Sequence, residues 1–167
     1  MNTIYLIGLM GVGKTTAGEM LSSLTNKSFI DLDYEIEKAS GLTVVNFFEE
    51  RGESSFRSFE SKLLKSFSKS IISCGGGVVL SSSNRDFLKK NGKVILLTAS
   101  LHEIEKRLVK TNTRPLLNNE SIKESLGILW KKREKDYHDT ADLIVDTDNK
   151  SVQQVANELR IVISEEN

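Results

Sequence analysis

The residues of this sequence whose types and spacing point most directly to chemistry are Gly8 to Thr15, which read Gly-Leu-Met-Gly-Val-Gly-Lys-Thr. Glycines let a backbone curl so that successive N–H groups point at one phosphate. Lys14 would reach the β- and γ-phosphates of a nucleoside triphosphate, and the Thr15 hydroxyl would bind the accompanying Mg²⁺. The pattern predicts a phosphate-binding loop. The residues expected to contact the nucleotide there are Gly11, Val12, Gly13, Lys14, Thr15 and Thr16.

A plainer interpretation of this stretch is a glycine-rich turn. The apolar run Ile4 to Ile7 precedes it, and a helical pattern from Thr16 to Leu24 follows it. A helix that begins at the loop presents free N–H groups and its positive dipole end to the same anion. Because this strand-loop-helix context is the one that phosphate binding needs, we prefer the phosphate-binding loop.

Two carboxylates, Asp31 and Asp33, end a second short strand predicted over residues 28–33. Alternate residues of a strand point to the same face, so one carboxylate could help hold a hydrated Mg²⁺ while the other accepts a proton from an acceptor hydroxyl. Alternatively, Asp33 is a helix N-cap. The run Leu143 to Asp146 also ends in a carboxylate. We prefer Asp31 for the magnesium side because its strand directly follows the loop and first helix.

Arg57 and Glu60 lie three residues apart in a predicted helix. One interpretation is a surface ion pair that contributes only about 0.2–1 kcal/mol. However, Phe56 and Phe59 flank Arg57, which favours an arginine that points into a cleft. A guanidinium there would bind an anionic substrate, because its fork matches a carboxylate.

Two further segments combine polar chemistry with unusual backbone. Gly75 to Gly77 follow the third predicted strand, where they would let a ligand approach backbone N–H groups. Arg114 lies in the polar segment 111–121, next to the only proline, Pro115. If this loop closes, Arg114 would reach the phosphates and water would be excluded. The alternative is a solvated loop arginine.

Five short apolar segments alternate with helical patterns along the chain, which predicts a three-layer α/β domain with a parallel sheet. Ligands of such sheets bind at the carboxyl ends of the strands. This rule brings the glycine loop, both aspartates and the triple glycine to one edge. The predicted strands are residues 4–7, 28–33, 71–74, 94–98 and 143–145.

Composition narrows the classes of partner. Lys plus Arg and Asp plus Glu both number 23, so the formal net charge is zero. A nucleic-acid or membrane-surface binder needs a basic excess, so we expect neither partner. The single cysteine, Cys74, and the two histidines show no metal-ligand spacing. The N-terminal apolar segment is short and enters the loop directly, so we expect a cytoplasmic protein.

Taken in order, these motifs resemble those of the shikimate kinase family, small P-loop enzymes with the nucleoside monophosphate kinase type of fold. The chain departs from the family pattern at Lys132 and Lys135, where an acidic residue and a proline are usual. The matching elements are Gly8-x4-Gly13-Lys14-Thr15-Thr16-x-Gly18, Asp31-Leu32-Asp33, Gly52-Glu53-x-x-Phe56-Arg57-x-x-Glu60, Gly75-Gly76-Gly77, Arg114-Pro115-Leu116-Leu117, and Arg133 with Tyr137.

The resemblance implies a single kinase domain over 1–167, with substrate-binding helices at about 33–61 and a lid at about 111–122. Family members transfer the γ-phosphate of ATP to the 3-hydroxyl of shikimate, so the implied ligands are ATP with Mg²⁺ and shikimate, bound by a monomer. The implied shikimate contacts are Asp33, Arg57, Gly75, Gly76, Gly77 and Arg133, with the two arginines at the carboxylate. The implied remaining roles are a lid arginine at Arg114, an adenine contact at Arg107, magnesium-side groups at Thr15, Asp31 and Ser73, and catalytic groups at Lys14, Asp33 and Arg114.

Two other functions remain open. A P-loop kinase for gluconate or a nucleoside monophosphate would also use Arg57 and Arg133, because guanidinium groups suit phosphates as well as carboxylates. A nucleotide-binding switch such as a GTPase is a different class. It predicts Asn-Lys-x-Asp, and Asp-x-x-Gly after the third strand, and the sequence contains neither.

Overall fold

The computed structural model describes residues 3–111 and 122–164. Its sheet has five strands in the order β2-β3-β1-β4-β5, and every pair is parallel. The central strands are buried and carry apolar residues on both faces, as expected for a sheet that helices cover on both sides. The strands are β1 Thr3–Ile7, β2 Phe29–Asp31, β3 Ile71–Ser73, β4 Gly92–Thr98 and β5 Leu143–Asp146.

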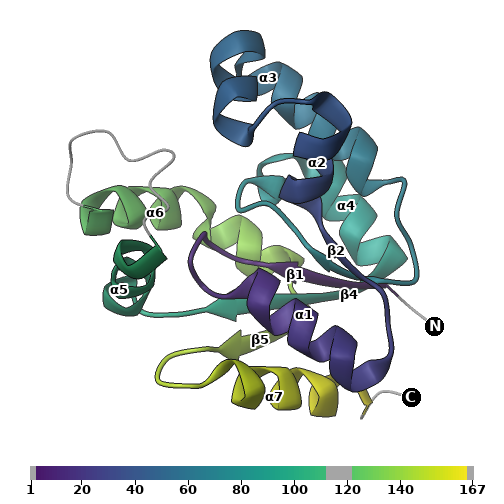
Figure 1. Ribbon diagram of the computed structural model, residues 1–167, viewed down its shortest axis with the longest axis vertical. Helices are drawn as coiled ribbons and strands as arrows, with labels where there is room; N and C mark the ends of the chain where they lie inside the picture. Colours follow the sequence, from purple (N-terminus) through teal and green to yellow (C-terminus); the bar gives the residue numbers. More distant parts are fainter. Residues whose placement is uncertain (1–2, 112–121, 165–167) are drawn as a thin grey trace.

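Helices cover both faces of this sheet, which confirms the predicted three-layer α/β class. Figure 1 shows α1 and α7 together on one side, and these two helices are in contact. Helices α4 and α6 form another contacting pair. In the view of Figure 1, α2 packs against α3 above the sheet. The helices are α1 Lys14–Thr25, α2 Leu32–Ser40, α3 Val44–Leu64, α4 Ser82–Asn91, α5 Leu101–Thr111, α6 Ile122–Thr140 and α7 Val152–Ser164, with a 3₁₀ turn, η1, at Val78–Leu80.

Several helix boundaries follow the local signals in the sequence. The Thr43 side chain accepts a hydrogen bond from the Asn46 N–H at the start of α3. Gly41 ends α2 with a left-handed φ of 73°, and Gly52 interrupts α3 with a φ of 77°. Glycine is favoured at these positions because residues with a side chain rarely adopt a positive φ.

The boundary between β2 and α2 differs from the prediction. The strand ends at Asp31, and Asp31 rather than Asp33 is the N-cap of α2, because its side chain accepts the Tyr34 N–H. Asp33 lies in the first helical turn, so the expectation that both carboxylates alternate along one strand is wrong. The cap competes with strand extension and ends the strand two residues early.

Among residues 3–111 and 122–164, each helix is too short or too polar to span a bilayer.

Candidate active site

The phosphate-loop residues Gly8 to Thr15 connect β1 to α1 at the carboxyl edge of the sheet. Gly11 and Gly13 have φ angles of 78° and 95°, which glycine tolerates and other residues rarely adopt. Lys14 lies over the loop, and its Nζ donates to the carbonyl oxygens of Gly8 at 2.9 Å and Leu9 at 2.8 Å. Burial lowers the pKa of Lys14, and the nearby Asp33 carboxylate partly offsets that effect. The ammonium group is therefore held against the loop whose backbone N–H groups are expected to bind a phosphate.

Three oxygen-bearing side chains meet beside the loop. Thr15 Oγ1 donates to Asp31 Oδ2 at 2.6 Å and lies 3.4 Å from Ser73 Oγ. Hydroxyl and carboxylate oxygens suit Mg²⁺, which keeps several waters and is bound largely through nucleotide phosphates. No cluster of three or more His, Cys, Asp or Glu occurs among the described residues, so a metal held mainly by protein carboxylates is not indicated there. The three residues fit the magnesium-side role implied by the resemblance.

A cavity of about 590 Å³ opens next to the phosphate loop. Its polar end contains one aspartate, one glutamate and two arginines, and its outer wall is apolar. The polar lining is Asp33, Arg57, Glu60 and Arg133 with the glycines Gly75, Gly76 and Gly77, and the apolar lining includes Val44, Phe48, Phe56, Leu108 and Leu129. The structure thus gathers the predicted acceptor residues from α2, α3, α6 and the segment after β3.

Arg57 is fixed inside this cavity by two carboxylates and two rings. Its Nη1 donates to Glu60 Oε2 at 2.9 Å, and its Nε lies 3.4 Å from Glu53 Oε1. The guanidinium carbon is 5.2 Å from the Phe56 ring centre and 5.7 Å from that of Phe48. The prediction that Arg57 points into a cleft is confirmed, and the surface ion pair is wrong because Glu60 is completely buried.

Glu60 is the site residue that sequence reasoning undervalued. Burial raises the pKa of Glu60 to about 7, although the Arg57 guanidinium opposes the shift. Its second oxygen, Oε1, has no hydrogen-bond partner among the described residues. A signal did exist, because Phe56, Glu60 and Leu64 share the helical spacing of one buried face. A carboxylate on such a face faces the protein interior rather than solvent.

Gly75 and Gly77, the outer residues of the triple glycine, are required for space. A Cβ on Gly75 would lie 2.8 Å from Asp33 Oδ1 and from Glu60 Oε1, and one on Gly77 would lie 2.3 Å from Arg57 Nη2. A side chain at either position would therefore displace charged groups of the cavity, whereas a Cβ on Gly76 would make only ordinary contacts at 3.5 Å. Burial, and then the neighbouring Asp31 charge, raise the pKa of Asp33.

Helix α6 holds the middle of this glycine segment. The Gly76 carbonyl oxygen accepts a hydrogen bond from Arg133 Nη1 at 3.1 Å and another from the Tyr137 hydroxyl. Burial raises the pKa of Tyr137 to about 12, so the hydroxyl remains a donor at neutral pH. Arg133 therefore reaches the cavity despite the lysines at 132 and 135.

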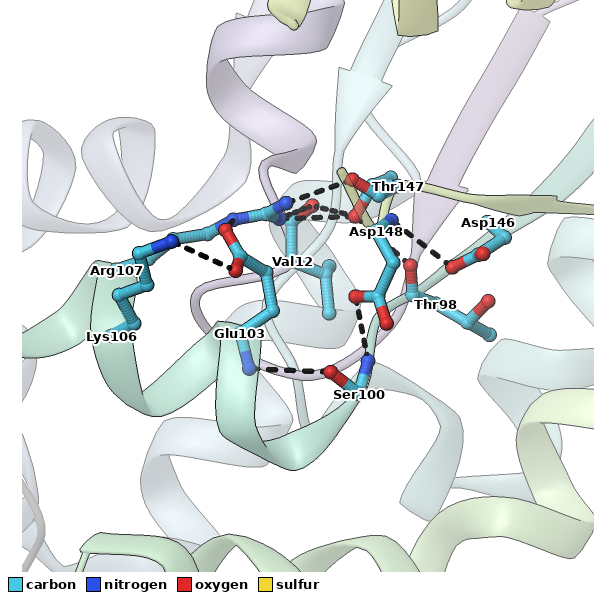
Figure 2. A network of polar contacts seen from close by, with 9 residues as sticks. All are labelled: Val12, Thr98, Ser100, Glu103, Lys106, Arg107, Asp146, Thr147 and Asp148. Atoms are coloured by element: carbon cyan, nitrogen blue, oxygen red, sulfur yellow. Dashed lines mark hydrogen bonds and ion pairs between the residues drawn. The ribbon is translucent and has the colours of Figure 1, made fainter. Parts of the chain in front are cut away.

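A second cavity of about 260 Å³ lies on the other side of the phosphate loop, beside Gly13, Thr16 and Arg107. Arg107 donates to the carbonyl oxygens of Val12 and Thr147, as Figure 2 shows. The structure thus places Arg107 next to the nucleotide loop. Arg114 and the predicted lid, apart from its ends at Thr111 and Ile122, lie outside the described residues.

A phosphate loop with a magnesium-type oxygen cluster, adjoining a cavity for a small anionic acceptor, defines a P-loop small-molecule kinase. The family model described as shikimate kinase matches residues 10–164. A shikimate kinase of Bacillus mycoides is 38% identical over 99% of this chain and 100% of its own length, and one of Nitrosococcus oceani is 40% identical over 93% and 84%. A solved shikimate kinase from Acinetobacter baumannii in complex with shikimate superposes with a TM-score of 0.91 at 34% identity, covering 99% of this chain and 94% of that one. The chain belongs to the shikimate kinase family.

Proposed function

We propose that this enzyme transfers the γ-phosphate of ATP to the 3-hydroxyl of shikimate, giving shikimate 3-phosphate and ADP on the route to chorismate. The observation that carries the proposal is the pair Arg57 and Arg133 lining the same cavity as Asp33, directly beside the phosphate loop. A small ring bearing one carboxylate and several hydroxyls matches that set of charges. The solved relative in complex with shikimate supports the same acceptor.

The two arginines would bind the shikimate carboxylate, and Asp33 the ring hydroxyls. Both guanidinium groups are oriented before substrate binds, Arg57 by Glu60 and Arg133 by the Gly76 carbonyl. Preorganised donors lose little conformational entropy on binding. The backbone of Gly75 to Gly77 allows the ring to approach closely.

Transfer would occur in line and depend mainly on positioning and charge neutralisation. The acceptor oxygen attacks the γ-phosphorus, the bond to the bridging oxygen of ADP breaks, and Asp33 orients the hydroxyl and takes its proton. Burial is the main cause of the raised pKa of Asp33, and the higher pKa makes its carboxylate a better proton acceptor. Lys14 would neutralise the transferring phosphate, and Arg114 would add a second positive charge.

Thr15, Asp31 and Ser73 would hold Mg²⁺ with the nucleotide, Asp31 through water. When bound, the ion would supply positive charge that neutralises the phosphates during transfer. Thr15 and Asp31 are already joined by their 2.6 Å hydrogen bond, so their oxygens are positioned in advance. We also propose that the enzyme acts as a monomer, since the donor and acceptor groups described above all come from one chain. A cytoplasmic location is proposed because the reaction consumes ATP.

The test is ADP release from ATP and Mg²⁺ with shikimate, gluconate, a nucleoside monophosphate or no acceptor. Rapid release with shikimate alone supports the proposal. Release with gluconate or a monophosphate would assign a different acceptor, and slow release independent of acceptor would favour a nucleotide switch.

A further inference from the structure

A buried polar network joins α5 and the segment after β5 to the phosphate loop, apart from the acceptor cavity (Figure 2). Its two central residues are Arg107 of α5 and Thr147, which follows β5 directly. Thr147 is only 2% exposed. None of the family motifs recognised in the sequence includes Thr147.

The guanidinium of Arg107 donates hydrogen bonds from all three of its nitrogen atoms. Nη1 donates to the Val12 carbonyl at 3.2 Å and to Thr147 Oγ1 at 3.0 Å, and Nη2 donates to the Thr147 carbonyl at 2.8 Å. On the other side, Nε donates to Glu103 Oε1 at 3.2 Å. These acceptors lie on three different segments, so together they fix both the position and the plane of the group.

Thr147 is itself anchored to the end of β4. Its backbone N–H donates to the Thr98 carbonyl at 2.8 Å, and its hydroxyl lies 2.9 Å from the same oxygen and 3.2 Å from the Val12 carbonyl. The hydroxyl can therefore donate to a carbonyl while it accepts from Arg107. The neighbouring Asp148 accepts the Ser100 N–H at 2.8 Å and ties the segment to the start of α5.

The Val12 carbonyl is the point where this network meets the phosphate loop. A trans peptide unit is planar, so its C=O and N–H point in opposite directions. Holding the Val12 oxygen therefore aims the Gly13 N–H, and Gly13 has a φ of 95° that its own residue type does not enforce. The loop conformation at Val12 and Gly13 thus depends on contacts from outside the loop.

We propose that Thr147 is a positioning residue for the nucleotide, which acts through Arg107 to fix the Val12–Gly13 peptide in its phosphate-binding orientation. The inference rests on the proposed ATP site but not on the identity of the acceptor. Thr147→Val keeps the shape of the side chain and removes both hydroxyl functions. Arg107 then loses an acceptor, and the peptide gains freedom that nucleotide binding must remove.

The experiment is calorimetric titration of the full chain with Mg-ADP, without an acceptor. Thr147→Val is expected to weaken ADP binding about five- to tenfold, less than the full loss of a hydrogen bond to a charged group, because Arg107 keeps its bonds to Glu103 and to the Val12 and Thr147 carbonyls. Thr147→Ser should bind like the unmodified protein because it keeps the hydroxyl. The matched control is Thr140→Val, since Thr140 is also buried but its hydroxyl donates to the Asp136 carbonyl within α6.

A second comparison tests whether Thr147 acts through Arg107. In an Arg107→Lys background, adding Thr147→Val should change ADP affinity less than twofold, because the shared contact is already gone. Equal losses in both backgrounds, or equal losses for Thr140→Val and Thr147→Val, would overturn the proposal. If Thr147→Val does not fold, Thr147→Ala removes the hydroxyl with a smaller side chain and is judged by the same criteria.

Steady-state kinetics separate this inference from the proposed function. Thr147→Val should raise KM for ATP and leave KM for shikimate unchanged. A protein that binds ADP but phosphorylates no shikimate would contradict the proposed function, while the ADP titrations would still decide the role of Thr147.

Discussion

Glu60 and Arg57 show how burial changes the chemistry of a common residue pair. On a solvated helix, a pair three residues apart is weak and fully ionised. Here Glu60 is completely buried, and its carboxyl titrates near neutrality with a pKa of about 7. Arg57 is thereby held at the cavity by a partner whose charge depends on pH.

Glu60→Gln should change how stability depends on pH. Between pH 4.5 and 7 the folded state binds a proton at Glu60 that the unfolded state has lost, so rising pH destabilises the fold and the effect ends above pH 7. The free energy of unfolding of the unmodified protein, minus that of Glu60→Gln, should therefore fall by up to about 3 kcal/mol across this window. Urea unfolding at several pH values measures it.

Glu53→Gln is the control, because Glu53 also contacts Arg57 but is 62% exposed. It shows how much of any change comes from the loss of a contact with Arg57 rather than from the removal of a buried carboxyl. A pH-independent difference between the unmodified protein and Glu60→Gln would contradict the raised pKa of Glu60.

Arg57→Ala tests the anionic acceptor. Loss of a charge-assisted pair should cost about 1.5–3 kcal/mol of shikimate binding, a roughly ten- to hundredfold increase in KM for shikimate. KM for ATP should change little, since Arg57 lines the acceptor cavity and is not among the residues that line the cavity beside Arg107. Arg85→Ala removes a half-buried arginine outside that cavity and should leave both constants unchanged. Unchanged shikimate saturation in Arg57→Ala would refute the assignment.

At the scale of secondary-structure elements, local signals were sufficient for most of the fold. Apolar runs predicted all five strands, and the helical patterns between them predicted the layers that cover the sheet. The role of Asp31 as a cap was missed because strand and helix compete for the same residues. The burial of Glu60 was missed because it depends on the packing of α3 against α2 and on the approach of Gly75, which sequence spacing describes only in part.

The role of the triple glycine belongs to this scale, because three helices and the loop converge on it. Gly77→Ala should push the Arg57 guanidinium out of position, since the new Cβ would lie 2.3–2.5 Å from its atoms. We expect KM for shikimate to rise at least tenfold, with ATP binding and thermal stability nearly unchanged because the displaced group is the end of a flexible side chain.

Gly127→Ala is the matched control for this substitution. Gly127 lies in α6, and its Cβ would make only an ordinary 3.7 Å contact with Leu101. It should preserve both KM values and slightly stabilise the helix. If Gly77→Ala bound shikimate normally, the space-requirement argument for the triple glycine would fail.

Two half-sites, the phosphate loop and the acceptor cavity, lie at one edge of a single sheet. The phosphate loop follows the central strand β1, the triple glycine follows its neighbour β3, and Asp33 lies just after β2, the edge strand beyond β3. This arrangement explains how a chain with zero net charge binds two anionic ligands. The positive charges are few and local, and each is oriented by carbonyls or carboxylates of the same chain.

Ligand-linked stability tests whether the two half-sites exist independently. Because Arg57 and Arg133 are already oriented, shikimate alone at a hundred times its Kd should stabilise the fold by about 2.7 kcal/mol, which raises Tm by roughly 5–10 °C. Mg-ADP alone should act similarly, and the two shifts should nearly add, since the two ligands use different side chains. Thermal unfolding followed by circular dichroism measures both. At the same shikimate concentration, Arg57→Ala should reduce the shikimate stabilisation to about 0.4–1.4 kcal/mol and keep the ADP shift. A shikimate shift that required nucleotide would mean that the acceptor cavity forms only after nucleotide binds.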